Sequence, residues 1–73
     1  MIESAEEFVA LRTSNDPSEY RRAAHDSATD SVWLDVIDRF PDMRRWVAHN
    51  KTTSAAILER LSVDPDASVR WQV

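Results

Sequence analysis

Three prolines stand at a constant spacing of 24 residues in this chain, at Pro17, Pro41 and Pro65. Proline is favoured at the first position of a helix, because its missing N–H would have no partner there and its φ angle is already helical. The chain has no glycine, which most hairpin turns need to reach positive φ. A sheet-rich fold is therefore disfavoured, and the three prolines predict three equivalent short helices.

A shift of the sequence by 24 residues also aligns other positions. Ala24-His25-Asp26 falls on Ala48-His49-Asn50, and Ile37 falls on Leu61. The third copy keeps its proline but needs a two-residue insertion before Val69-Arg70-Trp71-Gln72-Val73 can align. Self-similarity at a fixed period is the signature of repeat proteins, in which each unit covers the apolar side of its neighbour. The sequence predicts an all-α, solenoid-like stack of two-helix repeats.

Capping signals place the predicted helices along the chain. Ser4-Ala5-Glu6-Glu7 and Asp16-Pro17-Ser18-Glu19 have the pattern of capping boxes. They predict a first helix that ends near residue 13 and a short helix that ends near residue 25. Further helices are expected at about 30–39 and 42–49, then one capped by Thr53 or Thr52, and a last short helix that begins at Asp64-Pro65.

The apolar residues of these helices predict the core. Trp33, Leu34, Ile37 and Phe40 form the expected inward stripe of residues 30–39. Phe8 and Leu11 are expected to point inward from the first helix, and Ile57, Leu58 and Leu61 from the last long one. Asn50 is expected to end the 42–49 helix as the best available substitute for a C-cap glycine.

The repeat period suggests how the single domain of residues 1–73 is organised. The predicted parts are an N-terminal capping helix (1–15), repeat 1 (16–39), repeat 2 (40–63) and a partial repeat 3 (64–73). Three repeats are the usual minimum for such a stack. Two possibilities follow: the array continues in a longer protein, or its open end pairs with a second copy.

The second unit and the start of the third carry a motif set known from one repeat family. The residues are Phe40-Pro41-Asp42-Met43-Arg44-Arg45-Trp46-Val47-Ala48-His49-Asn50, Ile57-Leu58-Glu59-Arg60-Leu61, Asp64-Pro65-Asp66 and Val69-Arg70. They resemble the Asp-Pro, Val-Arg, Val-Ala-x-Asn and Leu-x-x-Leu patterns of the leucine-rich repeat variant family, a HEAT-like helical repeat. The resemblance covers about residues 16–73 and is loose in the first unit, which lacks the Val-Arg pair and has Asp26 where Asn is expected.

The resemblance carries expectations about structure and role. It implies a right-handed superhelix of alternating α and 3₁₀ helices without a sheet. It implies scaffolding or recognition as the role, and it provides no catalytic motif to transfer.

Composition limits the remaining classes of function. Cysteine is absent, which excludes disulfides and thiolate metal sites and fits a reducing compartment. The N-terminal residues are acidic where a signal peptide would be basic, and no long apolar run follows. The net charge of −4 opposes nonspecific phosphate binding. We expect a cytoplasmic protein that has no membrane span, cofactor, metal or small-molecule substrate.

The candidate catalytic or metal-binding residues have simpler structural explanations. His25 and His49 occupy equivalent positions near the ends of short helices, where an imidazole faces the negative end of the helix dipole. Asp26, Asp30, Asp35 and Asp38 alternate with apolar residues, as on a solvated helix face. The Ser and Thr residues lie at caps. The sequence therefore predicts that the chain is not an enzyme.

Arginine and tryptophan residues recur on the short helices and form the candidate partner-binding set. We call this set the Arg–Trp ridge; it comprises Arg21, Arg22, Arg44, Arg45, Trp46, Arg70 and Trp71. The simpler interpretation is that the arginines pair with acids and that both tryptophans pack at the edge of the core. The functional one is a contact surface, since Trp and Arg are enriched at binding hot spots. The tryptophans lie off the inward pairs Met43–Val47 and Val69–Val73.

Two functions from different classes follow. The leading hypothesis is a non-catalytic module that binds another protein, or another copy of itself, through the Arg–Trp ridge. The alternative is a nucleic-acid-binding HEAT-like repeat that uses the arginines as a basic stripe. The acidic net charge disfavours that alternative.

Overall fold

The computed structural model describes residues 1–72 of the chain. Those residues form helices, turns and loops, with no β-strand among them, so the all-α prediction is confirmed. The predicted pairing of Val73 with Val69 lies outside the described residues. The elements are α1 (Ala5–Thr13), α2 (Pro17–His25), α3 (Asp30–Arg39), the 3₁₀ helix η1 (Pro41–Met43), α4 (Arg44–His49), α5 (Ala55–Ser62) and α6 (Ala67–Arg70).

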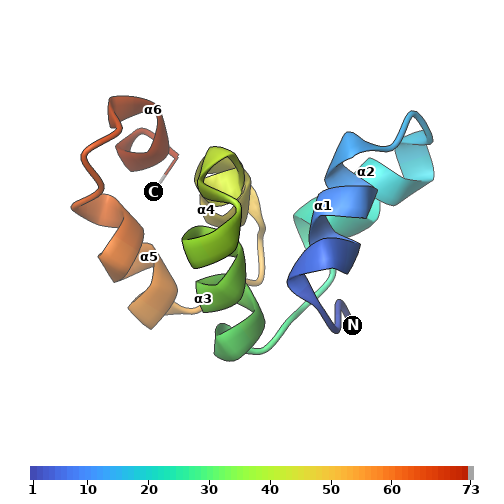
Figure 1. The fold of residues 1–73 in the computed structure, drawn as a ribbon, viewed down its shortest axis with the longest axis horizontal. Coiled ribbons are helices and arrows are strands. Elements are labelled where there is room, and N and C mark those ends of the chain that lie inside the picture. The colour runs from blue at the N-terminus through green and yellow to red at the C-terminus, as the bar shows by residue number, and fades with distance from the viewer. Residues whose placement is uncertain (73) are drawn as a thin grey trace.

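The helices follow one another in pairs along the long axis of the molecule (Figure 1). The pair α1/α2 lies at one end, α3/α4 in the middle and α5/α6 at the other end, over a length of 31 Å. Contacts link α1 to α3 and α3 to α5 on one side, and α4 to α6 on the other. Helices α1, α3 and α5 therefore lie along one side of the molecule, and α4 and α6 lie along the other. The handedness and curvature of the stack remain predictions.

Side-chain caps begin four of the helices. The Ser4 hydroxyl accepts a hydrogen bond from the Glu7 N–H at 3.1 Å, as the first capping box predicts. The Glu7 carboxylate reaches the N–H of Glu3, not that of Ser4. The Asp16 carboxylate accepts from the Ser18 N–H at 2.9 Å and begins α2 at Pro17. Both predicted starts are confirmed, because each cap satisfies an N–H that has no partner within the helix.

The predicted cap of α5 is wrong by one residue. The Ser54 hydroxyl accepts from the Ile57 N–H, whereas the two threonine hydroxyls act as donors. Thr53 is buried and its hydroxyl donates to the Val47 carbonyl at 2.8 Å. The threonines therefore satisfy carbonyls of the preceding loop and helix α4, a role that depends on tertiary contacts.

The three prolines are equivalent only in part. Pro17 and Pro41 are the first residues of α2 and η1, but Pro65 lies two residues before α6. Asp66 caps α6 by accepting from the Ser68 N–H at 2.9 Å, the same contact that Asp16 makes at α2. The predicted start of the last helix at Pro65 is therefore wrong. The two-residue insertion needed to align the third copy with the others lies between this proline and its helix.

The core is centred on Trp33, which is fully buried and meets Phe8 edge-to-face at a centroid distance of 5.1 Å. The predicted burial of Trp33, Phe8 and Leu11 is confirmed. The predicted inward position of Leu34 is wrong: Leu34 is 40% exposed and Val36 is buried instead. At 3.6 residues per turn, a residue three positions after Trp33 lies closer to its face than the next residue does.

Asn50 ends α4, but without the backbone geometry expected of a glycine substitute. Its φ of −61° and ψ of 133° are extended, and no residue among 1–72 has a positive φ. The contacts of Asn50 to the rest of the fold come from its side chain. Its amide donates to the carbonyls of Ala23 at 2.8 Å and Asp26 at 3.0 Å. The next N–H, of Lys51, donates to the Ala24 carbonyl. Asn50 therefore joins the end of α4 to the end of α2.

Asp26, the residue that replaces Asn in the first unit, has a different role. A carboxylate cannot donate to carbonyls as an amide does. Asp26 instead accepts from Arg22 Nε at 3.0 Å within its own unit. The carbonyl of Ser27, in the loop after α2, is satisfied by the N–H of the fully buried Ile2. The N-terminal segment thus packs against the loop that follows α2.

None of the helices in the described part of the chain combines the length and apolar character needed to cross a membrane.

Candidate interaction surface

The seven residues of the Arg–Trp ridge do not share one environment. The structure divides them into residues held by contacts inside the fold and residues that face outward. Arg22, Arg44 and Arg70 belong to the first group. Arg21, Arg45 and Trp71 are exposed, and Trp46 is half-buried. The ridge predicted from the repeat period is therefore only partly available to a partner.

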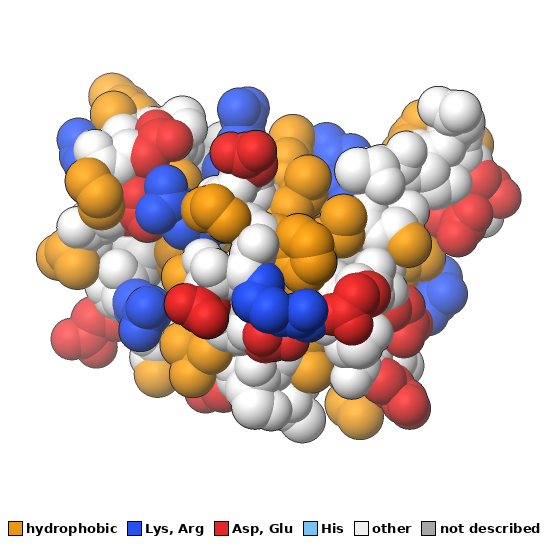
Figure 2. Space-filling model, viewed as in Figure 1, with side chains coloured by type: hydrophobic (Ala, Val, Ile, Leu, Met, Phe, Trp, Pro, Cys, Tyr) orange, Lys and Arg blue, Asp and Glu red, His pale blue; other side chains and the backbone are white. Residues whose placement is uncertain are grey.

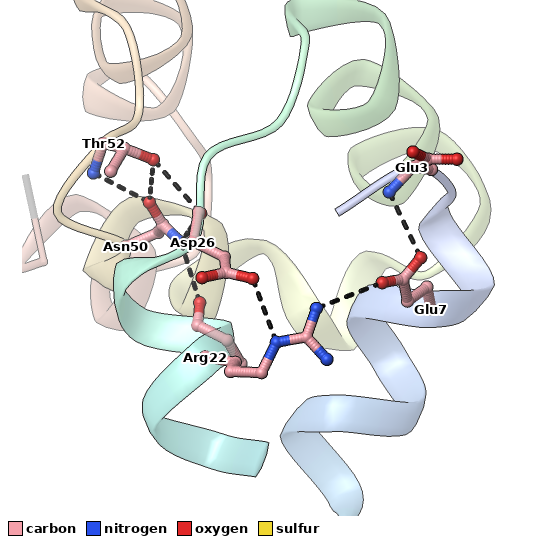
Figure 3. Close-up of polar contacts among 7 residues, drawn as sticks. Glu3, Glu7, Arg22, Asp26, Asn50 and Thr52 are labelled. Carbon is pink, nitrogen blue, oxygen red and sulfur yellow. Dashed lines mark hydrogen bonds and ion pairs between the residues drawn. The ribbon is translucent and has the colours of Figure 1, made fainter. Parts of the chain in front are cut away.

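Arg22 connects the first two helices (Figure 3). Its Nη2 lies 3.5 Å from the Glu7 carboxylate of α1, and its Nε lies 3.0 Å from the Asp26 carboxylate at the end of α2. The guanidinium group is about half exposed, so solvent weakens both ion pairs. Because Arg22 lies between two carboxylates, it links α1 to the end of α2 and is less available to a partner.

Arg44 and Arg70 meet at Asp64, in the loop between α5 and α6. The Asp64 side chain is only 7% exposed and its Oδ2 lies 3.3 Å from Arg44 Nη1. Arg70 donates to the backbone carbonyl of Asp64, and the Asp66 N–H donates to its Oδ1 at 2.8 Å. One buried acid thus ties α4 and α6 together. In the sequence, Asp64-Pro65 indicates only a helix boundary, and no local signal indicates this second role.

Among the ridge residues, Trp71 clearly faces solvent. Trp71 follows α6 and is 85% exposed, whereas Val69 two residues earlier is buried. Val63, at the end of α5, is 79% exposed. A tryptophan is usually largely buried in a monomeric fold. The structure therefore does not show Trp71 packed at the edge of the core.

Trp46 lies at the edge of the core and is surrounded by cationic and aromatic groups. The guanidinium carbon of Arg12 lies 3.5 Å from the centroid of the Trp46 ring, and that of Arg45 lies 4.9 Å from it. His49 meets the ring edge-to-face at 5.8 Å. Arg12 belongs to α1 and falls outside the repeat period, so no sequence pattern indicates this contact.

The residues considered for catalysis or metal binding lie at the ends of the helices α2 and α4 and along α3. His25 and His49 are the last residues of α2 and α4, as predicted. Within residues 1–72 no three His, Asp or Glu side chains are close enough together to hold a metal ion. Asp35 accepts from Arg39 at 2.7 Å, and this hydrogen bond lowers the pKa of its carboxyl. Arg39 also pairs with Glu6 of α1.

Charges of both signs are mixed on the surface. Figure 2 shows basic and acidic side chains beside one another on one face, with hydrophobic side chains between them. The ion pairs of Arg22, Arg39 and Arg44 account for part of this mixing. The arginines that recur with the repeat therefore do not all add to one basic stripe.

The family comparison concerns the segment that contains the Arg44–Asp64 ion pair. The family model described as leucine rich repeat variant matches residues 41–66. The suspected family resemblance is confirmed. The leucine rich repeat variant segment includes η1, α4, α5 and the buried Asp64 that Arg44 contacts. Comparison with curated proteins and with solved structures gives no match.

Proposed function

We propose that this chain is a non-catalytic helical-repeat module that binds another protein through the outward-facing part of the Arg–Trp ridge. That contact surface consists of Arg21, Arg45, Trp46 and Trp71. The observation that carries the proposal is the 85% exposure of Trp71. Exposed tryptophan and arginine side chains are the groups that most often dominate binding energy at protein interfaces.

The family match supports the same kind of role. Leucine rich repeat variant repeats are helical, typically non-catalytic and commonly related to interaction, and residues 41–66 match that family. We further propose the repeat boundaries given by the period, namely 16–39, 40–63 and 64–73 after a capping segment of 1–15. A cytoplasmic location is part of this proposal and rests on the absence of cysteine.

The nucleic-acid alternative has less support. A phosphate-binding stripe needs several cations that are free to release counterions. Arg22 and Arg44 lie against carboxylates, and Arg70 donates to a backbone carbonyl. Together with the net charge of −4, these contacts favour a protein partner.

The proposal is tested by comparing captured proteins. Wild-type chain, the double variant Arg45→Glu/Trp71→Ala and the control Arg60→Glu are immobilised and exposed to the same cell extract. Arg60 is an exposed arginine on α5 outside the contact surface, so it matches the charge change. We expect the partner to be retained by the control and reduced at least about tenfold by the double variant.

Two outcomes are informative about this surface. Equal recovery from all three proteins would contradict the proposed contact surface. Light scattering over a concentration series separates a foreign partner from a second copy. A mass that rises with concentration in the wild type and not in the double variant assigns the surface to self-association.

A further inference from the structure

A small groove of about 170 Å³ lies beside Trp46, and residues of three helices line it. Arg12 of α1, Tyr20 of α2 and His49 of α4 stand around it, with the indole ring as one wall. The methyl groups of Ala23 and Ala24 complete the lining. The volume is well below the roughly 300–1,000 Å³ of most small-molecule and cofactor sites. It suits one side-chain-sized group of a partner.

Two arginines that lie against Trp46 have no acidic partner in the part of the chain that the structure describes. Arg22, Arg39 and Arg44 each form an ion pair, but no carboxylate lies within ion-pair distance of Arg12 or Arg45 among residues 1–72. Both guanidinium groups instead lie near the ring of Trp46, at 3.5 Å and 4.9 Å. The local charge is therefore positive on an acidic protein.

Arg12 is held in place before any ligand arrives. Its guanidinium carbon lies 3.5 Å from the Trp46 centroid and 5.9 Å from the Tyr20 centroid. Contact of a guanidinium face with an aromatic ring is favourable and leaves the N–H groups at its edge free to donate. Because the side chain is already ordered, binding costs less conformational entropy.

We propose that this groove binds a carboxylate side chain from an acidic segment of the partner protein. The proposal rests on the proposed function and names the chemistry of the partner. The edge of Arg12 donates to the carboxylate, in the charge-assisted geometry that guanidinium groups favour. The His49 imidazole and the Tyr20 hydroxyl supply further polar groups around the same space. The alanine methyl groups accommodate the aliphatic part of a Glu side chain.

A carboxylate fits these observations better than a nucleic-acid backbone. A single carboxylate needs only the two local cations, whereas a phosphate backbone needs a track of them. Beyond this groove, Arg22, Arg39 and Arg44 are occupied by acids. The rest of the surface would therefore oppose an extended polyanion.

The test is a nuclear magnetic resonance titration of the isotope-labelled chain. The probe is the blocked peptide acetyl-Leu-Glu-Glu-Leu-amide, and the matched control is acetyl-Leu-Gln-Gln-Leu-amide. We expect the indole N–H of Trp46 and the Nε–H of Arg12 to shift with the Glu peptide only. Arg12→Gln and Arg12→Lys should weaken binding about tenfold or more, whereas Arg60→Gln should have no effect.

Several results would overturn the inference. These are equal shifts with both peptides, no shift at Trp46 and Arg12, or unchanged affinity in both Arg12 variants. Tighter binding of inorganic phosphate or of a single-stranded oligonucleotide would assign the groove to phosphate. If the peptide fails to bind while Arg45→Glu/Trp71→Ala still loses its captured partner, the inference alone fails. Peptide binding with unchanged capture would instead contradict the wider contact surface.

Discussion

The side-chain amide of Asn50 donates a hydrogen bond of 2.8 Å to the backbone carbonyl of Ala23, and so connects the ends of helices α4 and α2. The same amide reaches the Asp26 carbonyl at 3.0 Å, and its oxygen accepts from the Thr52 N–H at 2.8 Å. Each polar atom of this buried side chain is therefore satisfied (Figure 3). Such a contact specifies how one repeat lies against the next.

Replacing Asn50 with Asp should weaken this junction strongly. The new carboxylate keeps the shape of the amide but loses both donors and faces two carbonyl oxygens. We expect the free energy of unfolding to fall by about 3 kcal/mol, near the upper end for an unsatisfied buried polar group. Urea unfolding followed by circular dichroism measures the change. The matched control is Asn15→Asp, because Asn15 is exposed. Equal effects of the two substitutions would contradict a junction role.

The contact between Arg44 and Asp64 predicts energetic coupling. Their side chains are 24% and 7% exposed, so the pair is largely shielded from solvent. A double-mutant cycle with Arg44→Met and Asp64→Asn should give a coupling free energy of about 0.5–3 kcal/mol. Chemical denaturation of the four proteins provides it. Purely additive effects would mean that Arg44 is available to a partner.

Much of the helical layout could be predicted, because it depends on local signals. Ser4 and Asp16 cap helices where the capping boxes indicate, and α3 begins and ends as expected at Asp30 and Arg39. The errors arise where tertiary contacts decide. The Thr53 hydroxyl donates to the Val47 carbonyl and does not cap α5, and the insertion after Pro65 shifts the start of α6.

The candidate surface was less predictable than the fold. The period could identify recurring arginines but not their partners, which lie on other helices. Glu7 for Arg22 and Asp64 for Arg44 are examples. Arg12 lies outside the repeat, so its contact with Trp46 could be found only in three dimensions.

Trp33 and Trp71 should differ sharply in their contributions to stability. Trp33 is fully buried, so Trp33→Ala should cost about 3–5 kcal/mol, enough to unfold a domain of this size. Trp71 is 85% exposed, and Trp71→Ala should change stability by no more than about 0.5 kcal/mol. Thermal unfolding of the two variants compares them. A large loss in Trp71→Ala would show that Trp71 packs within the fold.

The ionised carboxylate of Asp66, which caps α6, should make the stability of the fold depend on pH in acid. Hydrogen bonds from the Ser68 hydroxyl and N–H lower the pKa of Asp66 from its ordinary value of 3.8, and the nearby Arg44 and Arg45 lower it further. Because the folded pKa is below the unfolded one, the contribution is present above pH 3.8 and is lost as the pH falls through the folded value. Asp66→Asn retains a capping oxygen without a titrating proton.

This acid dependence can be measured by following the melting temperature as the pH is lowered through the carboxyl range. We expect a shallower decline for Asp66→Asn than for the wild type. Asp38→Asn is the control, because Asp38 is exposed and caps no helix. A variant that declines as steeply as the wild type would contradict a role for the ionised cap.

The end of α4 lies against the end of α2 through the side chain of Asn50. Nuclear Overhauser contacts of the Asn50 side-chain amide are the direct test of this packing. We expect cross-peaks from this amide to protons of Ala23 and Asp26, which are 27 and 24 residues away in the sequence. Cross-peaks confined to α4 and the turn that follows it would show that the two helix ends do not meet in this way.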